Sequence, residues 1–138
     1  GELYSVINGV ASTAVARRLQ KNFRNAGLEI TIEQWSILYH LWKEDGLSQQ
    51  ELCTRTFRDK ASITRLIDNI EKLGLVERIA SKDDRRVNLV YLTDAAKPLQ
   101  EATYNIANQT MNEALQGISK EEIEIVKSVF QRVYENSK

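Results

Sequence analysis

The stretch DKASITRLIDNIEKLGLVERIASKDDRRVNLVYLT, residues 59–93, changes its hydrophobic period from that of a helix to that of paired strands. Over residues 59–73 the spacing predicts one helix with a buried stripe of Ile63, Leu66, Ile67, Ile70 and Leu73. Asp59 can cap the start of this helix, and Gly74 suits a left-handed residue after its last turn. Residues 75–79 and 87–92 predict two strands joined by the polar turn 82–86, so the helix is followed by a β-hairpin.

Three capping patterns mark where other helices begin. Thr31-Ile-Glu-Gln34, Ser48-Gln-Gln-Glu51 and Ser119-Lys-Glu-Glu122 each place an acidic or amide side chain three residues after a hydroxyl, and each pair of side chains can satisfy free backbone amides reciprocally. We expect the first of these helices to end at Asp45-Gly46 and the second to be short, turning near residues 56–58. Two helices separated by a tight turn and followed by a hairpin make a winged helix-turn-helix.

Further helices are predicted at both ends of the chain. Apolar residues at helical spacing predict a first helix of about twenty residues before Gly27. A long helix is expected from Thr93 to about Gln116, with Pro98 early in it, and Gly117 separates it from a last helix. The predicted fold class is mainly α with a small β-hairpin. Residues 1–138 form one domain, in which 31–93 are a winged helix-turn-helix DNA-binding lobe and 1–27 and 94–138 are a helical dimerisation region.

The composition is that of an ordinary globular domain. The 138 residues are 42% apolar and 28% charged, and no apolar run approaches the roughly 18–20 residues that a membrane span needs. No signal-peptide pattern opens the sequence, and Cys53, the single cysteine, leaves no intrachain disulfide. We therefore expect a cytoplasmic protein without a membrane partner.

Positive charge is concentrated in one part of a chain whose net charge is zero. Residues 55–86 contain nine Lys or Arg and six Asp or Glu, so this segment has an excess of three positive charges and the remainder an equal negative excess. Phosphate binding needs local positive charge. The distribution of charge along the chain therefore favours a nucleic-acid partner for the predicted helix-turn-helix, although the net charge of zero does not.

The polar face of the helix at 59–73 suits a helix that enters the major groove of double-stranded DNA. Ala61, Ser62 and Thr64 allow close approach to base edges, and Arg65 can bind guanine through two hydrogen bonds. The amides that begin the preceding helix can hold a backbone phosphate, and arginine at the hairpin tip can enter a narrow minor groove. A surface helix and a solvated charged turn are the alternative interpretation. The candidate DNA-contacting residues are Ser48, Gln49, Lys60, Ala61, Ser62, Thr64, Arg65, Asn69, Lys82, Arg85 and Arg86.

Three segments resemble the MarR family of bacterial transcription regulators. DRRVNLVYLT at 84–93 resembles the family's wing signature, an Asp-x-Arg followed by a strand that ends in Leu-Thr. Residues 59–78 are similar to its recognition helix and following strand, and Thr31-Ile-Glu-Gln-Trp35 resembles its second helix. The resemblance covers essentially the whole chain in helix order and length, with one departure at Ala96, where the family often has a glycine.

The resemblance implies a homodimer with two-fold symmetry on a pseudo-palindromic operator. Arg86 matches the wing arginine that enters the minor groove, and Asp84 matches the acid that braces the wing. The resemblance also implies a repressor whose DNA binding is modulated by a small aromatic or phenolic effector, bound between the DNA-reading lobe and the dimer helices. Aromatic side chains more often belong to a core, but the candidates for lining such a cavity are Trp35, Tyr39, Trp42, Tyr91 and Tyr104.

Apolar residues at both ends of the chain exceed what thin terminal helices can bury. Left uncovered, they would form an adhesive patch. We expect a second copy of the chain to cover them, and burial within one chain is the alternative. The predicted dimerisation residues are Leu3, Val6, Ile7, Val10, Ile118, Ile123, Val126, Phe130, Val133 and Tyr134.

Other functions find little support in the sequence. It contains no Gly-rich phosphate loop, no cluster of metal ligands and no nucleophile–base pair, so we expect neither an enzyme nor a bound metal or cofactor. His40 is expected to be a core or surface residue. Cys53 is expected to be a small buried thiol, although neighbouring Arg55 and Arg58 leave a Cys-based redox-sensing regulator as an alternative. The zero net charge leaves a winged-helix protein–protein interaction module without DNA binding as another.

Overall fold

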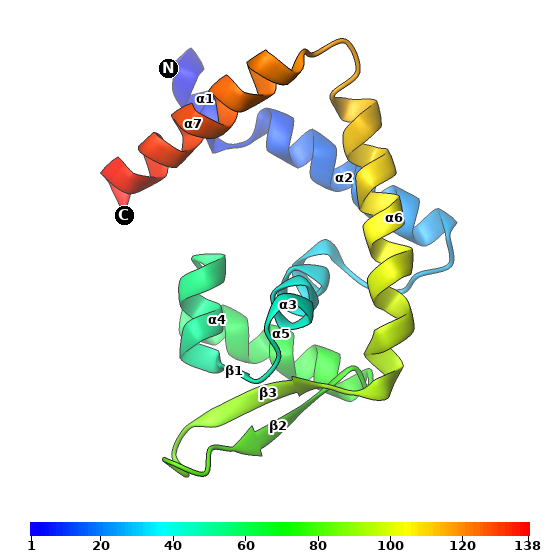
Figure 1. Cartoon of the computed structure of the whole chain (residues 1–138), viewed down its shortest axis with the longest axis vertical. Helices are drawn as coiled ribbons and strands as arrows, with labels where there is room; N and C mark the ends of the chain where they lie inside the picture. Colours follow the sequence, from blue (N-terminus) through cyan, green and yellow to red (C-terminus); the bar gives the residue numbers. More distant parts are fainter.

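The computed structural model describes residues 1–138 as seven α-helices, one 3-10 turn and a three-stranded sheet (Figure 1). The mainly helical fold with a small antiparallel sheet confirms the predicted fold class. None of its helices is both long and apolar enough to cross a membrane. In chain order the elements are α1 (Glu2–Asn8), α2 (Val10–Asn25), α3 (Ile32–Lys43), β1 (Leu47–Ser48), α4 (Gln49–Thr56), α5 (Lys60–Lys72), β2 (Val76–Ala80), β3 (Asn88–Leu92), η1 (Asp94–Ala96), α6 (Lys97–Ala114) and α7 (Lys120–Ser137).

Helices begin at the predicted caps, but one capping box is incomplete. The Thr31 hydroxyl accepts from the Gln34 backbone amide at 3.1 Å, and the Gln34 side chain accepts from the Thr31 amide at 3.0 Å. The box at 119–122 is formed in the same way. At Ser48 only half of the predicted box is present, because the Glu51 carboxylate accepts from the Ser48 hydroxyl and not from its backbone amide. Ser48 also belongs to β1, and its backbone therefore lies at the junction of a strand and a helix.

The first predicted helix is broken in two, so the expectation of one continuous helix is wrong. Gly9 has a φ of 136° and separates α1 from α2. Glycine adopts this conformation without the steric cost that a Cβ would bring. The apolar spacing continues across the break, and periodicity alone therefore does not reveal it.

The sheet has one more strand than the sequence predicts. Its order is β1-β3-β2 with all pairs antiparallel, and Leu47 of β1 lies opposite Val90 of β3. Gly46 leads the chain into this pairing with a φ of 72°, and a Cβ there would lie 2.8 Å from the Tyr91 ring. A strand of two residues has no readable period, so β1 is visible only in the folded chain. The two predicted strands are both present as β2 and β3, each starting one residue later than expected.

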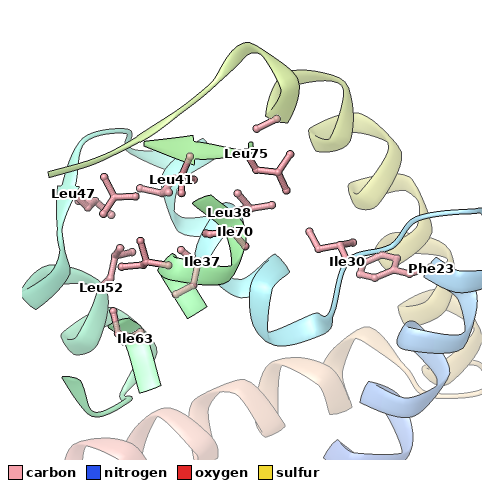
Figure 2. Packing of buried hydrophobic residues seen from close by; sticks show 14 of the residues in the cluster. Phe23, Ile30, Ile37, Leu38, Leu41, Leu47, Leu52, Ile63, Ile70 and Leu75 are labelled. Carbon is pink, nitrogen blue, oxygen red and sulfur yellow. The ribbon is translucent and has the colours of Figure 1, made fainter. Parts of the chain in front are cut away.

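The hydrophobic core gathers between α3, α5 and the sheet (Figure 2). Leu66 is half-buried against this core, but Leu73, predicted for the same stripe, is 51% exposed. Leu73 is the C-cap of α5, where the chain turns into Gly74, so its side chain leaves the buried face of the helix. The central residues of the core are Ile37, Leu38 and Leu41 of α3 together with Ile63, Ile67 and Ile70 of α5.

Helix α6 joins the sheet to the opposite end of the molecule (Figure 1). The helix expected from Thr93 begins as the 3-10 turn η1 and becomes α-helical only at Lys97, so its predicted start is about one turn early. Helix α6 packs along α2, where the Asn22 amide donates to the Thr110 hydroxyl at 2.8 Å. After Gly117 the chain continues into α7, which buries no residue. The hairpin therefore lies at one end of the molecule and α1 and α7 at the other.

Candidate nucleic-acid interface

Helices α4 and α5 form the predicted helix-turn-helix. Between them Phe57 takes a left-handed conformation, with φ 53° and ψ 42°, and the Arg58 amide donates to the Cys53 carbonyl at 3.1 Å. Asp59 then caps α5 by accepting from the Ser62 amide at 2.7 Å. This hydrogen bond is the main reason why the pKa of Asp59 lies below its ordinary value, so the capping carboxylate is ionised at neutral pH.

The residues predicted to contact DNA differ in exposure. Ser48 is buried, and its hydroxyl is used within the cap of α4. Ser62 and Thr64 are half-buried on α5. Because the isoleucines of α5 are buried, the exposed polar side chains occupy the opposite face of that helix. Of the residues predicted to contact DNA, those exposed on α5 are Lys60, Ala61, Arg65 and Asn69.

The Arg78 guanidinium ties α4, α5 and β2 together. It donates to the Asp68 carboxylate at 2.6 Å and to the Glu71 carboxylate at 2.9 Å, both on α5. Its Nε donates to the Gln49 side chain of α4 at 3.0 Å. The Arg78 side chain is 17% exposed, and charge-assisted hydrogen bonds of this kind are the stronger ones in proteins. The recognition helix is thereby attached both to the preceding helix and to the strand that leads into the hairpin.

Two of the predicted DNA contacts belong to this same network. Gln49 accepts from Arg78 and donates through its Nε2 to the Thr64 hydroxyl at 3.3 Å. Both side chains therefore brace α4 against α5 within the protein. Arg78 itself was not predicted from the sequence, although a basic residue inside a strand, following Asp68 and Glu71 on the preceding helix, is a signal that could have found it.

The hairpin tip, the wing, is held by an ion pair between its own residues. The Asp84 carboxylate accepts from Arg86 Nε at 3.1 Å, from Arg86 Nη2 at 3.2 Å and from the Arg86 backbone amide at 3.0 Å. The Arg86 guanidinium is the main cause that holds the pKa of Asp84 below its ordinary value. The Arg86 side chain is nevertheless 91% exposed, and its Nη1 is left free to donate elsewhere. Lys82 and Arg85 are exposed on the same tip.

The wing and the helix-turn-helix enclose a shared groove. A hollow of about 350 Å³ is lined by residues from α4, α5 and the wing. It brings Arg86 to the same space as Lys60, although they are far apart in the sequence. Cys53 lines this hollow as a half-buried residue, which differs from the fully buried thiol expected from the sequence. The polar residues of the lining are Ser48, Gln49, Gln50, Lys60, Arg86 and Asn88.

A second candidate surface is the apolar end that α1, α7 and the start of α2 form. The exposed fractions of its large side chains run from 40% at Ile7 to 71% at Leu3. Among the predicted dimerisation residues, Ile123 and Val133 are half-buried and the others are exposed. The sequence-based prediction missed three exposed apolar side chains of this surface, which are Tyr4, Ile125 and Val129.

An aromatic cluster lies between α3 and α6. The Tyr104 ring of α6 is 5.9 Å from Tyr39 and 5.7 Å from Trp42, and Trp35 is 5.7 Å from Tyr39, measured between ring centroids. A cavity of about 240 Å³ opens beside Trp35, Tyr39 and Tyr104, with Lys43 at its edge. The indole N–H groups of Trp35 and Trp42 are buried without a hydrogen-bond partner.

His40 is in contact with this cluster, whereas Tyr91 is not. His40 stacks edge to face on Tyr39, and burial, followed by the charges of Arg55 and Lys43, holds the pKa of His40 below its ordinary value. The imidazole is therefore neutral at pH 7. Tyr91, predicted as a lining residue, is not part of the cluster, because it lies on β3 against Gly46.

A helix-turn-helix followed by an arginine-tipped wing, with a groove between them, is the arrangement of the winged helix-turn-helix class. Proteins of this class typically bind DNA. Comparisons with known proteins narrow that class. A sequence profile of the MarR family matches residues 27–87. The crystal structure of the transcriptional regulator PA3341 is similar with a TM-score of 0.81 at 29% identity, over 96% of each chain. A probable transcriptional regulator from Pseudomonas aeruginosa is 30% identical with a TM-score of 0.76, over 88% of this chain and 92% of its own.

A MarR transcriptional regulator from Methanosarcina mazei Go1 is 25% identical with a TM-score of 0.80, over 99% of this chain and 94% of its own. The chain belongs to the MarR family of transcriptional regulators.

Replacing Arg78 with alanine should lower the free energy of unfolding by about 1–2 kcal/mol, because charge-assisted hydrogen bonds are lost while their acidic partners keep some contact with water. Urea denaturation measures this change. Arg55→Ala is a matched control, since Arg55 pairs with Glu44 at 3.1 Å but is more exposed than Arg78. The control should lose less than about 0.5 kcal/mol. Equal losses in the two variants would contradict a central role for Arg78.

Proposed function

We propose that the chain is a homodimeric repressor that binds a pseudo-palindromic operator in double-stranded DNA. The observation that carries this proposal is the groove in which the start of α4, Lys60 at the start of α5 and the wing arginine meet. In this arrangement α5 enters the major groove while the wing follows the backbone to the adjacent minor groove. A palindromic site matches the two-fold symmetry of a dimer.

The exposed residues of α5 are suited to reading base edges. Arg65 can bind guanine with two hydrogen bonds, and Ala61 leaves room for a thymine methyl. Lys60 at the helix start adds positive charge where the helix dipole already favours phosphate. Gln49 and Thr64 are used in the Arg78 network, so we assign their side chains to holding α5 and the free amides at the start of α4 to a backbone phosphate.

The wing supplies the minor-groove contact. Its Arg86 guanidinium is held by Asp84 but keeps Nη1 free, so it can enter a narrow minor groove in a preset orientation. The Asp84 carboxylate is paired with Arg86, so it does not face phosphate as an isolated negative charge. Lys82 and Arg85, exposed on the same tip, add contacts to the DNA backbone.

The first experiment is a binding titration at two salt concentrations, using a duplex selected from a random-sequence pool by the wild-type protein and a scrambled duplex. We expect a clear preference for the selected duplex and an affinity that falls with salt. Arg86→Ala should weaken binding and reduce the slope of log affinity against log salt by about one for each subunit of the dimer. Arg132→Ala, an exposed arginine on α7 outside the helix-turn-helix and the wing, is the matched control and should change neither.

Two outcomes would contradict the DNA-binding proposal. An unchanged affinity and slope in Arg86→Ala would remove the wing from the mechanism. The wild-type protein could also bind every selected duplex no more strongly than the scrambled one. That result would favour the alternative, a winged-helix module that binds protein.

The apolar end formed by α1 and α7 supports the dimer. Exposed apolar patches of this kind on a monomer mark interaction sites. Phe130→Glu places a charge at the centre of the exposed face of α7 and should convert a wild-type dimer to a monomer in sedimentation equilibrium. Leu73→Glu is the control, because Leu73 is an exposed apolar residue at the C-cap of α5, away from this end. A Phe130→Glu variant that stays dimeric would place the interface elsewhere.

The aromatic cavity supports control by a small effector. Its ring walls, the unpartnered indole N–H of Trp35 and the Lys43 ammonium suit a phenol or an aromatic carboxylate. A ligand that favours the conformation with misplaced recognition helices would release the DNA. Titration with a panel of phenols and benzoates should quench the fluorescence of Trp35 saturably and weaken binding to the selected duplex. Tyr104→Ala removes one wall and should abolish both effects; a panel without any saturable response would contradict the proposed effector site.

A further inference from the structure

Phe57, in the turn of the helix-turn-helix, is in a conformation and an environment that a phenylalanine normally avoids. It is the only residue other than glycine with a positive φ, and its side chain is 75% exposed. A Cβ is disfavoured in the left-handed region, and a large exposed ring gains little from burial. A backbone outlier that is not compensated by core packing is a reason to look for a role.

The Phe57 ring contacts the dimerisation end of the chain. Its centroid lies 6.1 Å from that of Tyr134 on α7, with the ring planes at 79°, the edge-to-face geometry that aromatic pairs prefer. The Lys138 ammonium lies 5.7 Å from the Tyr134 ring centroid. In Figure 1 the C-terminal end of α7 lies on the same side of the molecule as α4, in agreement with this contact.

This pair is a direct link between two parts of the molecule that otherwise touch little. Helix α7 buries none of its own residues. The aromatic pair is therefore an important contact between the C-terminal end of α7 and the rest of the chain. On the other side of the link, Phe57 comes two residues before Asp59, the cap of the recognition helix. The contact with α7 is therefore placed where a movement of α7 would act on the start of α5.

We propose that Phe57 is a positioning residue that sets the spacing between the two half-sites that the dimer accepts. The proposal rests on the proposed function as a homodimeric DNA-binding protein. In a dimer built through α1 and α7, the distance between the two recognition helices depends on how firmly each helix-turn-helix is attached to α7. The Phe57–Tyr134 pair provides that attachment, while the residues that read bases remain those of α5 and the wing.

Two single variants and their combination separate this role from folding. Phe57→Gly removes the ring and also suits the positive φ, so the turn keeps its conformation and the melting temperature should not fall. Tyr134→Leu removes the partner ring but keeps an apolar residue at this predicted dimerisation position on α7, and sedimentation equilibrium checks that the variant stays dimeric. Leu73→Ala truncates another exposed apolar residue near the recognition helix and serves as the matched control.

The experiment measures affinity for three kinds of duplex: the palindromic site selected from a random pool by the wild-type protein, the same site with its half-sites moved by one or two base pairs, and a duplex with a single half-site. Wild-type protein and Leu73→Ala should lose about tenfold or more in affinity when the spacing changes by two base pairs, because the recognition helices must meet half-sites a fixed number of turns apart. Phe57→Gly and Tyr134→Leu should lose about threefold or less, and all proteins should bind the single half-site equally. The double variant should behave like either single one, because both changes break the same contact.

An unchanged spacing profile in both single variants overturns the inference and leaves DNA binding intact. A loss of affinity that is equal on the single half-site and on the full site also overturns it, because Phe57 would then act only on the recognition helix. A wild-type protein that binds no selected duplex overturns the proposed function and the inference together.

Discussion

The Arg78 guanidinium is the interaction on which the arrangement of the reading surface depends. It satisfies two carboxylates of α5 and the Gln49 side chain of α4, and it belongs to the strand that begins the wing. Without this cation, Asp68 and Glu71 would leave unbalanced negative charge on the helix that is proposed to approach phosphates. With it, those charges are paired within the protein, and the exposed cations of α5 and the wing set the sign of the groove.

The molecule separates a polar, cationic end from an apolar end, and α6 spans the distance between them (Figure 1). The aromatic cluster lies along this span, where Tyr104 of α6 meets Tyr39 and Trp42 of α3. These ring contacts therefore join the DNA-reading lobe to the helix that leads to the apolar end. The Phe57–Tyr134 contact is a second connection between them, and it lies on the opposite side of the DNA-reading lobe from α6.

Features that depend on near neighbours in the chain were predictable. The caps at Thr31, Asp59 and Ser119 form as expected, because donor and acceptor are only three residues apart. Features that depend on distant partners or on backbone geometry were not. Periodicity continues through Gly9 although the helix breaks there, and the stripe of α5 includes Leu73 although the chain has already turned away.

The sequence by itself determined the order of the elements, most of their limits and the family resemblance, because these follow from local periodicity, capping and a short wing motif. The tertiary structure alone decided which polar residues remain free. In the sequence, the small size and the hydroxyl of Thr64 are typical of a residue that contacts base edges. In the folded chain, however, this hydroxyl accepts a hydrogen bond from the Gln49 side chain. The physical reason is that a hydrogen bond between residues far apart in the chain exists only after the core of α3, α5 and the sheet has brought them together.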